Sequence, residues 1–230
     1  MTHTLLKCRA VCVLLAATML SGAALAHEED PPAPRSMRWD LSLDLPVWPS
    51  LSDLQPVAPG SFDDLGFGLG MSAQWSVKQF ASSELMLGID GSIAATDSSV
   101  SGGYEDLLAR QIYLGASAKW LVGDKRNLSF DVGFGYHEVD MAQVDSDWYD
   151  TWEHEHWSSS KPSGYIGATW DVGAGRPHRN DGVFVGFRVH FVDFGRVYDE
   201  DTLSPVPILG TDAGTLDGPL YFLRIGYSSR

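Results

Sequence analysis

Cysteine is nearly absent from this chain of 230 residues, and both copies, Cys8 and Cys12, lie close to its start. We expect residues 1–26 to be removed on export, so the mature chain would carry no thiol. This expectation excludes a disulfide framework and a cysteine-ligated metal site in the mature protein.

The first 26 residues have the features of a secretory signal peptide. Lys7 and Arg9 supply a positive start, residues 10–20 form an apolar run, and Ala24-Leu25-Ala26 is a small-residue cleavage pattern. The sequence therefore predicts Sec-type export, followed by a short flexible periplasmic lead over 27–36.

Long apolar runs and a basic excess are also missing. No later stretch approaches 18 consecutive apolar residues, which excludes a helical membrane protein. Without Lys7 and Arg9 the chain keeps 14 basic and 30 acidic residues, a net charge of −16, which argues against a nucleic-acid partner. A bilayer is still compatible, because a β-barrel can hold its charges in loops and lumen. We find no nucleotide-binding loop and expect no cofactor.

Helical periodicity is almost absent, and most of the chain shows alternation with a period of two residues instead. Apolar residues alternate with polar residues and glycine in eight segments, most of them about as long as a tilted strand needs to cross a bilayer. The predicted strands cover 37–45, 66–77, 84–93, 110–121, 128–139, 163–172, 183–193 and 219–227.

The connections between these segments alternate in length. Short turns followed by long loops, with both chain ends on the short-turn side, are typical of a barrel with short periplasmic turns and longer external loops. The predicted turns cover 78–83, 122–127 and 173–182, and the predicted loops cover 46–65, 94–109, 140–162 and 194–218.

Aromatic residues gather at the predicted periplasmic ends of the strands, on the apolar face. They are Trp39, Trp75, Trp120, Trp170 and Tyr227. Aromatic rings prefer the membrane–water interface, so we interpret the five as an aromatic girdle. The alternative is that they are ordinary core aromatics.

By strand count, topology and girdle, residues 37–227 resemble the small outer-membrane barrels of the OmpA, OmpX and OmpW type, although no signature motif matches. The resemblance implies an all-β fold, an eight-stranded antiparallel transmembrane up-and-down β-barrel over 37–230. It also implies a Gram-negative outer-membrane location, with outer-membrane lipid and lipopolysaccharide as neighbours.

The face opposite the apolar one carries the charged residues, which would lie in the lumen. In so narrow a space they must pair, so we expect a structural ion-pair network with Lys119, Arg188 and Arg224 as its cations. The alternative is a narrow path for a small solute or ion. The predicted network residues are Asp40, Asp44, Glu84, Asp90, Lys119, Asp131, His137, Asp171, Arg188, His190 and Arg224.

The predicted loop over 140–162 is acidic and contains two histidines. Glu153, His154 and His156 could hold a divalent metal, although the set lacks a defined further ligand. The simpler interpretation is a hydrated surface that meets an extracellular or envelope protein, with aromatics such as Trp157 at the outer interface.

A lipid A-modifying enzyme is a further alternative. His137 and His190 lie near the external rim, at a similar height to Ser92 and Ser163. All four fall on the lumen face rather than toward lipid, so we assign no catalytic residue. The sequence favours a structural or surface-interaction barrel over an enzyme or a pore.

Overall fold

The structure is a computed structural model that describes seven parts of the chain: 37–49, 66–99, 105–123, 126–145, 153–172, 182–196 and 215–229. Side chains are described in these parts except over 97–107 and 142–156. The predicted signal peptide and the lead over 27–36 lie outside the described residues.

The described chain forms eight β-strands, one in each predicted segment. None of the described residues forms a helix long and apolar enough to span a bilayer. The strands are β1 Met37–Val47, β2 Phe67–Gln79, β3 Ser83–Ser99, β4 Glu105–Val122, β5 Leu128–Asp145, β6 Glu153–Val172, β7 Gly182–Arg196 and β8 Thr215–Ser229.

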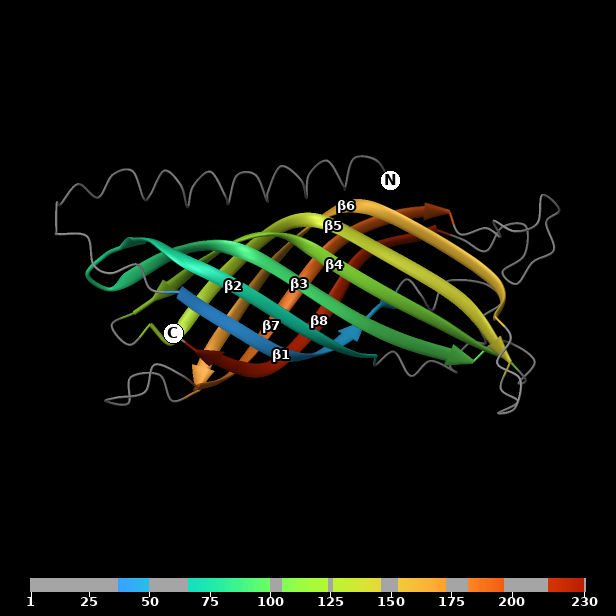
Figure 1. The fold of residues 1–230 in the computed structure, drawn as a ribbon, viewed down its shortest axis with the longest axis horizontal. Helices are drawn as coiled ribbons and strands as arrows, with labels where there is room; N and C mark the ends of the chain where they lie inside the picture. Colours follow the sequence, from blue (N-terminus) through green and yellow to red (C-terminus); the bar gives the residue numbers. More distant parts are fainter. Residues whose placement is uncertain are drawn as a thin grey trace.

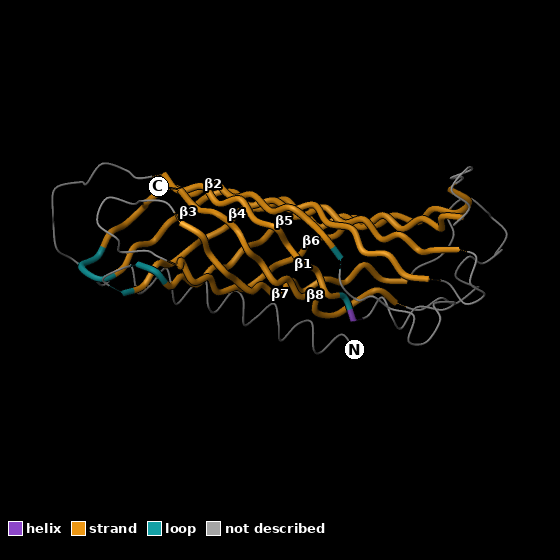
Figure 2. Tube along the Cα trace, turned by 90° about the horizontal axis from the view of Figure 1, so that it is seen from below, coloured by secondary structure: helices purple, strands orange, loops and turns teal. Residues whose placement is uncertain are grey.

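The strands close into one barrel in which every neighbouring pair is antiparallel (Figures 1 and 2). The last strand returns to the first: β8 pairs with β1 from Trp39 opposite Ser229 to Val47 opposite Tyr221. The predicted up-and-down barrel is confirmed. Closure matters because it leaves no sheet edge along the paired part of the wall.

Alternation along each strand separates the two faces of the wall. In β7, Val183, Val185 and Phe187 are exposed on the outside, whereas Phe184 and Arg188 are buried inside. The reason is that successive side chains of a strand point to opposite faces. The same alternation places polar residues in the interior from the turn end to the middle of the barrel.

The strands β3 to β6 are longer than predicted, and two loop predictions are therefore wrong. β5 continues to Asp145 and β6 begins at Glu153, so they are joined by 146–152 rather than by 140–162. β3 and β4 are joined by 100–104 rather than by 94–109. Connection lengths do not strictly alternate, since the turn over 173–181 is longer than both of these loops.

The two ends of the barrel differ in their connections, and each is named after them. The turn end holds the connections over 80–82, 123–127 and 173–181, together with the start of β1 and the end of β8. The loop end is the opposite one, beyond which β3 to β6 lengthen the wall. The pairing of β4 with β5 reaches from Val122 opposite Leu128 at the turn end to Glu105 opposite Asp145 at the loop end.

Candidate functional site: the barrel interior

All of the predicted network residues lie inside the barrel. None is more than 7% exposed, so each charge has left bulk water and needs a partner to offset a desolvation cost of several kcal/mol. The set comprises Asp40, Asp44, Glu84, Asp90, Lys119, Asp131, His137, Asp171, Arg188, His190 and Arg224.

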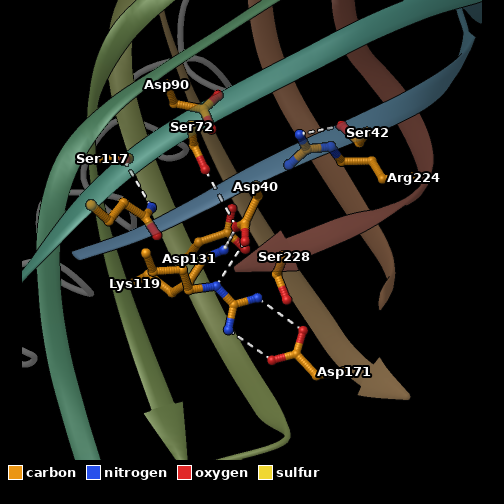
Figure 3. Close-up of polar contacts among 12 residues, drawn as sticks. Asp40, Ser42, Ser72, Asp90, Ser117, Lys119, Asp131, Asp171, Arg224 and Ser228 are labelled. Atoms are coloured by element: carbon orange, nitrogen blue, oxygen red, sulfur yellow. Dashed lines mark hydrogen bonds and ion pairs between the residues drawn. The ribbon is translucent and has the colours of Figure 1, made fainter. Parts of the chain in front are cut away.

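Near the turn end, Arg38 joins two carboxylates, those of Asp40 and Asp171, which are labelled in Figure 3. Its guanidinium donates two hydrogen bonds to Asp171, at 2.7 and 2.8 Å, and one to Asp40 at 2.7 Å. Asp40 also pairs with Lys119 from β4 and accepts a hydrogen bond from Ser72 at 3.3 Å. Arg38 is a cation that the sequence analysis did not select, although the alternation places it on the polar face of β1.

In the middle of the barrel, Arg188 of β7 reaches across to two other strands. It donates two hydrogen bonds to Asp90 of β3, at 2.7 and 2.8 Å, and one to Asp131 of β5 at 2.8 Å. Its guanidinium carbon lies 4.3 Å from the centre of the Tyr165 ring, a cation–π distance. One arginine therefore connects three strands and an aromatic ring.

Two smaller clusters of paired charges also lie inside the barrel. Arg224 of β8 donates to Asp44 at 2.9 Å and to Ser42 at 2.7 Å, and both acceptors lie on β1. At the turn end, Arg126 donates to the fully buried Glu84 at 2.9 Å. Arg126 lies between β4 and β5 with a φ of 49°, outside any alternating segment, so periodicity could not have found it.

The two predicted histidines lie together among aromatic rings. Their ring centres are 5.5 Å apart, and His190 stacks on Tyr165 at 4.9 Å. Tyr113 contacts both, and His137 Nε2 lies 3.1 Å from Gln111 Oε1. The structure thus places His137 and His190 in an aromatic layer rather than against the carboxylates.

At the loop end the interior changes from polar to apolar. We call this group the apolar cluster. The sequence did not predict this group, because seven of the eleven positions, among them Trp48, Met141 and Phe194, were taken as loop. Its buried members are Trp48, Ala94, Ala109, Val139, Met141, Trp157, Val192, Phe194, Leu216, Leu220 and Phe222.

The predicted position of Trp157 is therefore wrong. We expected it at the outer membrane interface, but it is 3% exposed and packs inside the barrel. The physical reason is that β6 begins before it, so Trp157 belongs to the wall and stands opposite Met141 of β5.

The candidate metal ligands Glu153, His154 and His156 lie at the start of β6 rather than in a loop. Their side chains are outside the described part of the structure. Among the described residues, no group of three His, Cys, Asp or Glu could hold a metal ion.

The outer wall is apolar and exposed between the two ends. Leu69, Met71, Leu114 and Phe134 are each more than half exposed, which is unusual for large apolar side chains over so wide a surface. The wall has the polarity of a protein that faces hydrocarbon.

The five predicted girdle residues lie on this wall, each two to four residues from a strand end at the turn end. Their exposed fractions run from 37% to 55%, so the interpretation as core aromatics does not fit their position. Trp39 and Tyr227 contact each other, with ring centres 5.8 Å apart. The five are Trp39, Trp75, Trp120, Trp170 and Tyr227.

Comparison with known proteins gives no family. No family model matches the chain, and no curated protein matches it.

Weak likenesses to solved structures exist. Ail, the attachment invasion locus protein of Yersinia pestis, is 11% identical with a TM-score of 0.44, covering 84% of this chain and 97% of that one. Neisserial surface protein A is 14% identical with a TM-score of 0.43, covering 86% and 99%. The outer membrane protease OmpT of Escherichia coli is 10% identical with a TM-score of 0.42, also covering 86% and 99%. These scores are too low to define the class of this chain.

The geometry of the chain defines its class. A closed antiparallel ladder satisfies the backbone, the wall exposes apolar side chains, and charged residues are paired inside. In hydrocarbon, only helices and closed barrels can satisfy every backbone polar group. The chain is an eight-stranded transmembrane β-barrel, with the architecture of the small outer-membrane barrels.

Proposed function

We propose that this chain is an integral outer-membrane β-barrel with a structural role, and that its interior is closed to solutes. The observation that carries the proposal is the set of buried arginine–carboxylate clusters that cross the interior. Arg38, Arg188 and Arg224 each bond a carboxylate on another strand. An eight-stranded barrel is only wide enough for its own side chains, so such bridges occupy the path.

The apolar cluster supports closure at the loop end. Trp48 and Phe194 are almost fully buried there, with ring centres 5.8 Å apart. A hydrated ion would have to leave its water to pass such a layer, at a cost that apolar side chains do not offset. Two kinds of packing would thus close the interior at different heights along the barrel: the buried ion pairs and the apolar cluster.

A surface-interaction role is the second candidate. It is supported by the extension of β3 to β6 toward the loop end, where the outside of the wall becomes polar, as at Arg110 and Glu138. A rigid extension of this kind could present the acidic loops to an extracellular or envelope protein. Export by the Sec route and contact with lipopolysaccharide belong to the same proposal.

Conductance in a planar bilayer tests the closed interior. We expect the purified, reconstituted protein to give no discrete current steps under conditions in which a known porin conducts. Discrete steps that change in Arg188→Ala, but not in the control Arg196→Ala, would show that the interior conducts. Arg196 is a suitable control because it is exposed at the end of β7.

A further inference from the structure

The wall of the barrel is incompletely paired between β6 and β7. Their ladder ends at the pair of Gly164 and Phe191, although both strands continue toward the loop end. Beyond this pair the described residues form no backbone pair between the two strands, and a hydrogen bond from Ser159 Oγ to the Phe194 carbonyl, at 3.4 Å, joins them instead. We call residues 157–163 of β6, together with the part of β7 that faces them, the seam.

Solvent reaches the inner face of β6 at the seam. Successive residues of a strand point to opposite faces, and on the inner face of β6 Trp157 and Ser163 are buried. Lys161 lies between them on the same face, opposite the buried His137 of β5, yet it is exposed. Because buried residues lie on both sides of Lys161 along the strand, solvent reaches it through the side of the barrel and not along the lumen.

The strand β7 is irregular on its side of the seam. Its ladder with β8 shifts register between Asp193 and Gly195, and Gly195 has a φ of 83°. A Cβ at position 195 would have no described atom within 4 Å apart from its chain neighbours, so the backbone borders open space here. A bulge bends the strand that carries it, so β7 can diverge from β6 at this height.

Buried polar side chains lie beside the last backbone pairs below the seam. Ser163 Oγ, Tyr165 Oη and His190 Nδ1 are buried, and none of the three has a hydrogen-bond partner among the described residues. Tyr165 and His190 stand opposite each other, next to the final pair of the ladder. A buried polar atom without a partner destabilises the closed arrangement, and water that reached these atoms would remove that cost.

The seam lies where the wall leaves the hydrocarbon. Glu138, which is exposed on the outer face of β5, stands opposite Ser160 of the seam. Unpaired backbone N–H and C=O groups are costly in hydrocarbon, whereas water satisfies them. The broken ladder is therefore tolerated at this height, and the medium next to the seam is water.

We propose that the seam is a lateral gate, in which residues 157–163 of β6 move away from β7 and admit external water to Ser163, Tyr165 and His190. The paired part of β6, from Gly164 onward, stays in the ladder and acts as the hinge. The inference rests on the proposed function, because the ion-pair clusters below the gate have to keep the opened space blind. Opening then exposes a polar and aromatic layer to the external side without conduction through the barrel.

Cysteine labelling of the full protein in detergent micelles tests the gate. Cys8 and Cys12 lie in the segment that we expect to be removed, so an introduced cysteine would be the only thiol of the mature chain. Ser163→Cys places a thiol beside the seam, whereas Ser117→Cys places one at a similarly buried position of β4, which is paired on both sides. We expect a water-soluble maleimide to label the Ser163→Cys variant roughly tenfold faster, because local opening exposes only the first thiol.

A second pair of substitutions tests what holds the gate closed. Ser159→Ala removes the hydrogen bond to the Phe194 carbonyl and should speed labelling of the Ser163→Cys variant roughly threefold to tenfold, the size of one hydrogen bond. Ser158→Ala changes the neighbouring serine, which points to the other face of β6, and should leave the labelling rate unchanged.

Hydrogen exchange of the unchanged protein gives a second measurement, which needs no substitution. We expect backbone amides of 157–163 and 192–196 to exchange faster than those of 165–171. Labelling of Ser163→Cys as slow as that of Ser117→Cys, or equal exchange on both sides of Gly164, would overturn the gate. Rapid labelling of both variants together with discrete conductance would instead overturn the closed interior on which the gate rests.

Discussion

At the scale of single residues, the interior depends on arginine. A guanidinium offers several donors in one plane and so can satisfy two carboxylates at once, which a lysine ammonium does with less geometric definition. Arg38 does this for Asp171 and Asp40, and Arg188 for Asp90 and Asp131. These arginines hold together strands that are not neighbours in the barrel.

Arg188→Leu should be strongly destabilising, because it leaves Asp90 and Asp131, each about 1% exposed, without their cation. Removing one partner of a buried ion pair costs about 3–5 kcal/mol. Urea unfolding in detergent or lipid, followed by tryptophan fluorescence, measures the loss.

Two variants serve as controls for this prediction. Arg196→Leu, at an exposed position, should change stability by less than about 0.5 kcal/mol. Adding Asp90→Asn and Asp131→Asn to Arg188→Leu should recover part of the loss, since no buried charge then remains unpaired. Similar losses for Arg188→Leu and Arg196→Leu would show that the central cluster does not stabilise the barrel.

Which residues face inward could be predicted from the sequence, because a period of two fixes the face of every strand residue. Which of these residues form ion pairs with one another could not be predicted from the sequence. Arg188 and Asp90 are 98 positions apart, and their contact depends on barrel closure and on the register of every ladder between them. Alternation along single strands predicts neither the closure of the barrel nor the register of its ladders.

At the scale of elements, β6 is the least regular part of the wall. Its pairing with β7 begins only at Gly164 opposite Phe191, although β6 itself starts at Glu153. Pro162 lies just before that first pair, and having no N–H it cannot donate to a neighbouring strand. Beyond it, Ser159 Oγ donates to the Phe194 carbonyl at 3.4 Å, so a side chain takes the place of the ladder.

Pro162→Ala should therefore change the free energy of unfolding by less than about 1 kcal/mol, because proline has no N–H and its replacement removes no hydrogen-bond donor from the ladder with β5. Ala168→Pro, in the part of β6 that pairs with both β5 and β7, should cost on the order of 2–3 kcal/mol. The same urea titration compares them. A loss for Pro162→Ala as large as that for Ala168→Pro would contradict the interpretation that the ladder between β6 and β7 ends beside Pro162.

The middle of every strand was predictable, but the loop ends of β3 to β6 were not. The predicted pattern has apolar residues outside and polar residues inside. Toward the loop end this pattern reverses: in β5, Val139 and Met141 are buried while Glu138 is exposed. If apolar residues are expected on the outer face, such a stretch looks like a loop in the sequence. Its backbone is nevertheless paired with the neighbouring strands.

At the scale of the whole molecule, the barrel combines two kinds of interior. From the turn end to the middle, ion pairs fill a lumen surrounded by an apolar wall. At the loop end the apolar cluster fills it, and the outside becomes polar, as in a water-soluble barrel. The change of polarity along the axis is what we expect of a barrel that leaves the hydrocarbon at its loop end.

The central claim is that the chain forms a closed barrel in a membrane, and electrophoretic heat-modifiability tests it most directly. Protein from a purified outer-membrane fraction would be run on a denaturing gel with and without boiling. We expect a compact, fast-migrating band without boiling that shifts to the mobility of the unfolded chain after boiling, because a closed ladder with buried ion pairs resists detergent. Recovery from the soluble periplasm, with no shift on boiling, would contradict the account.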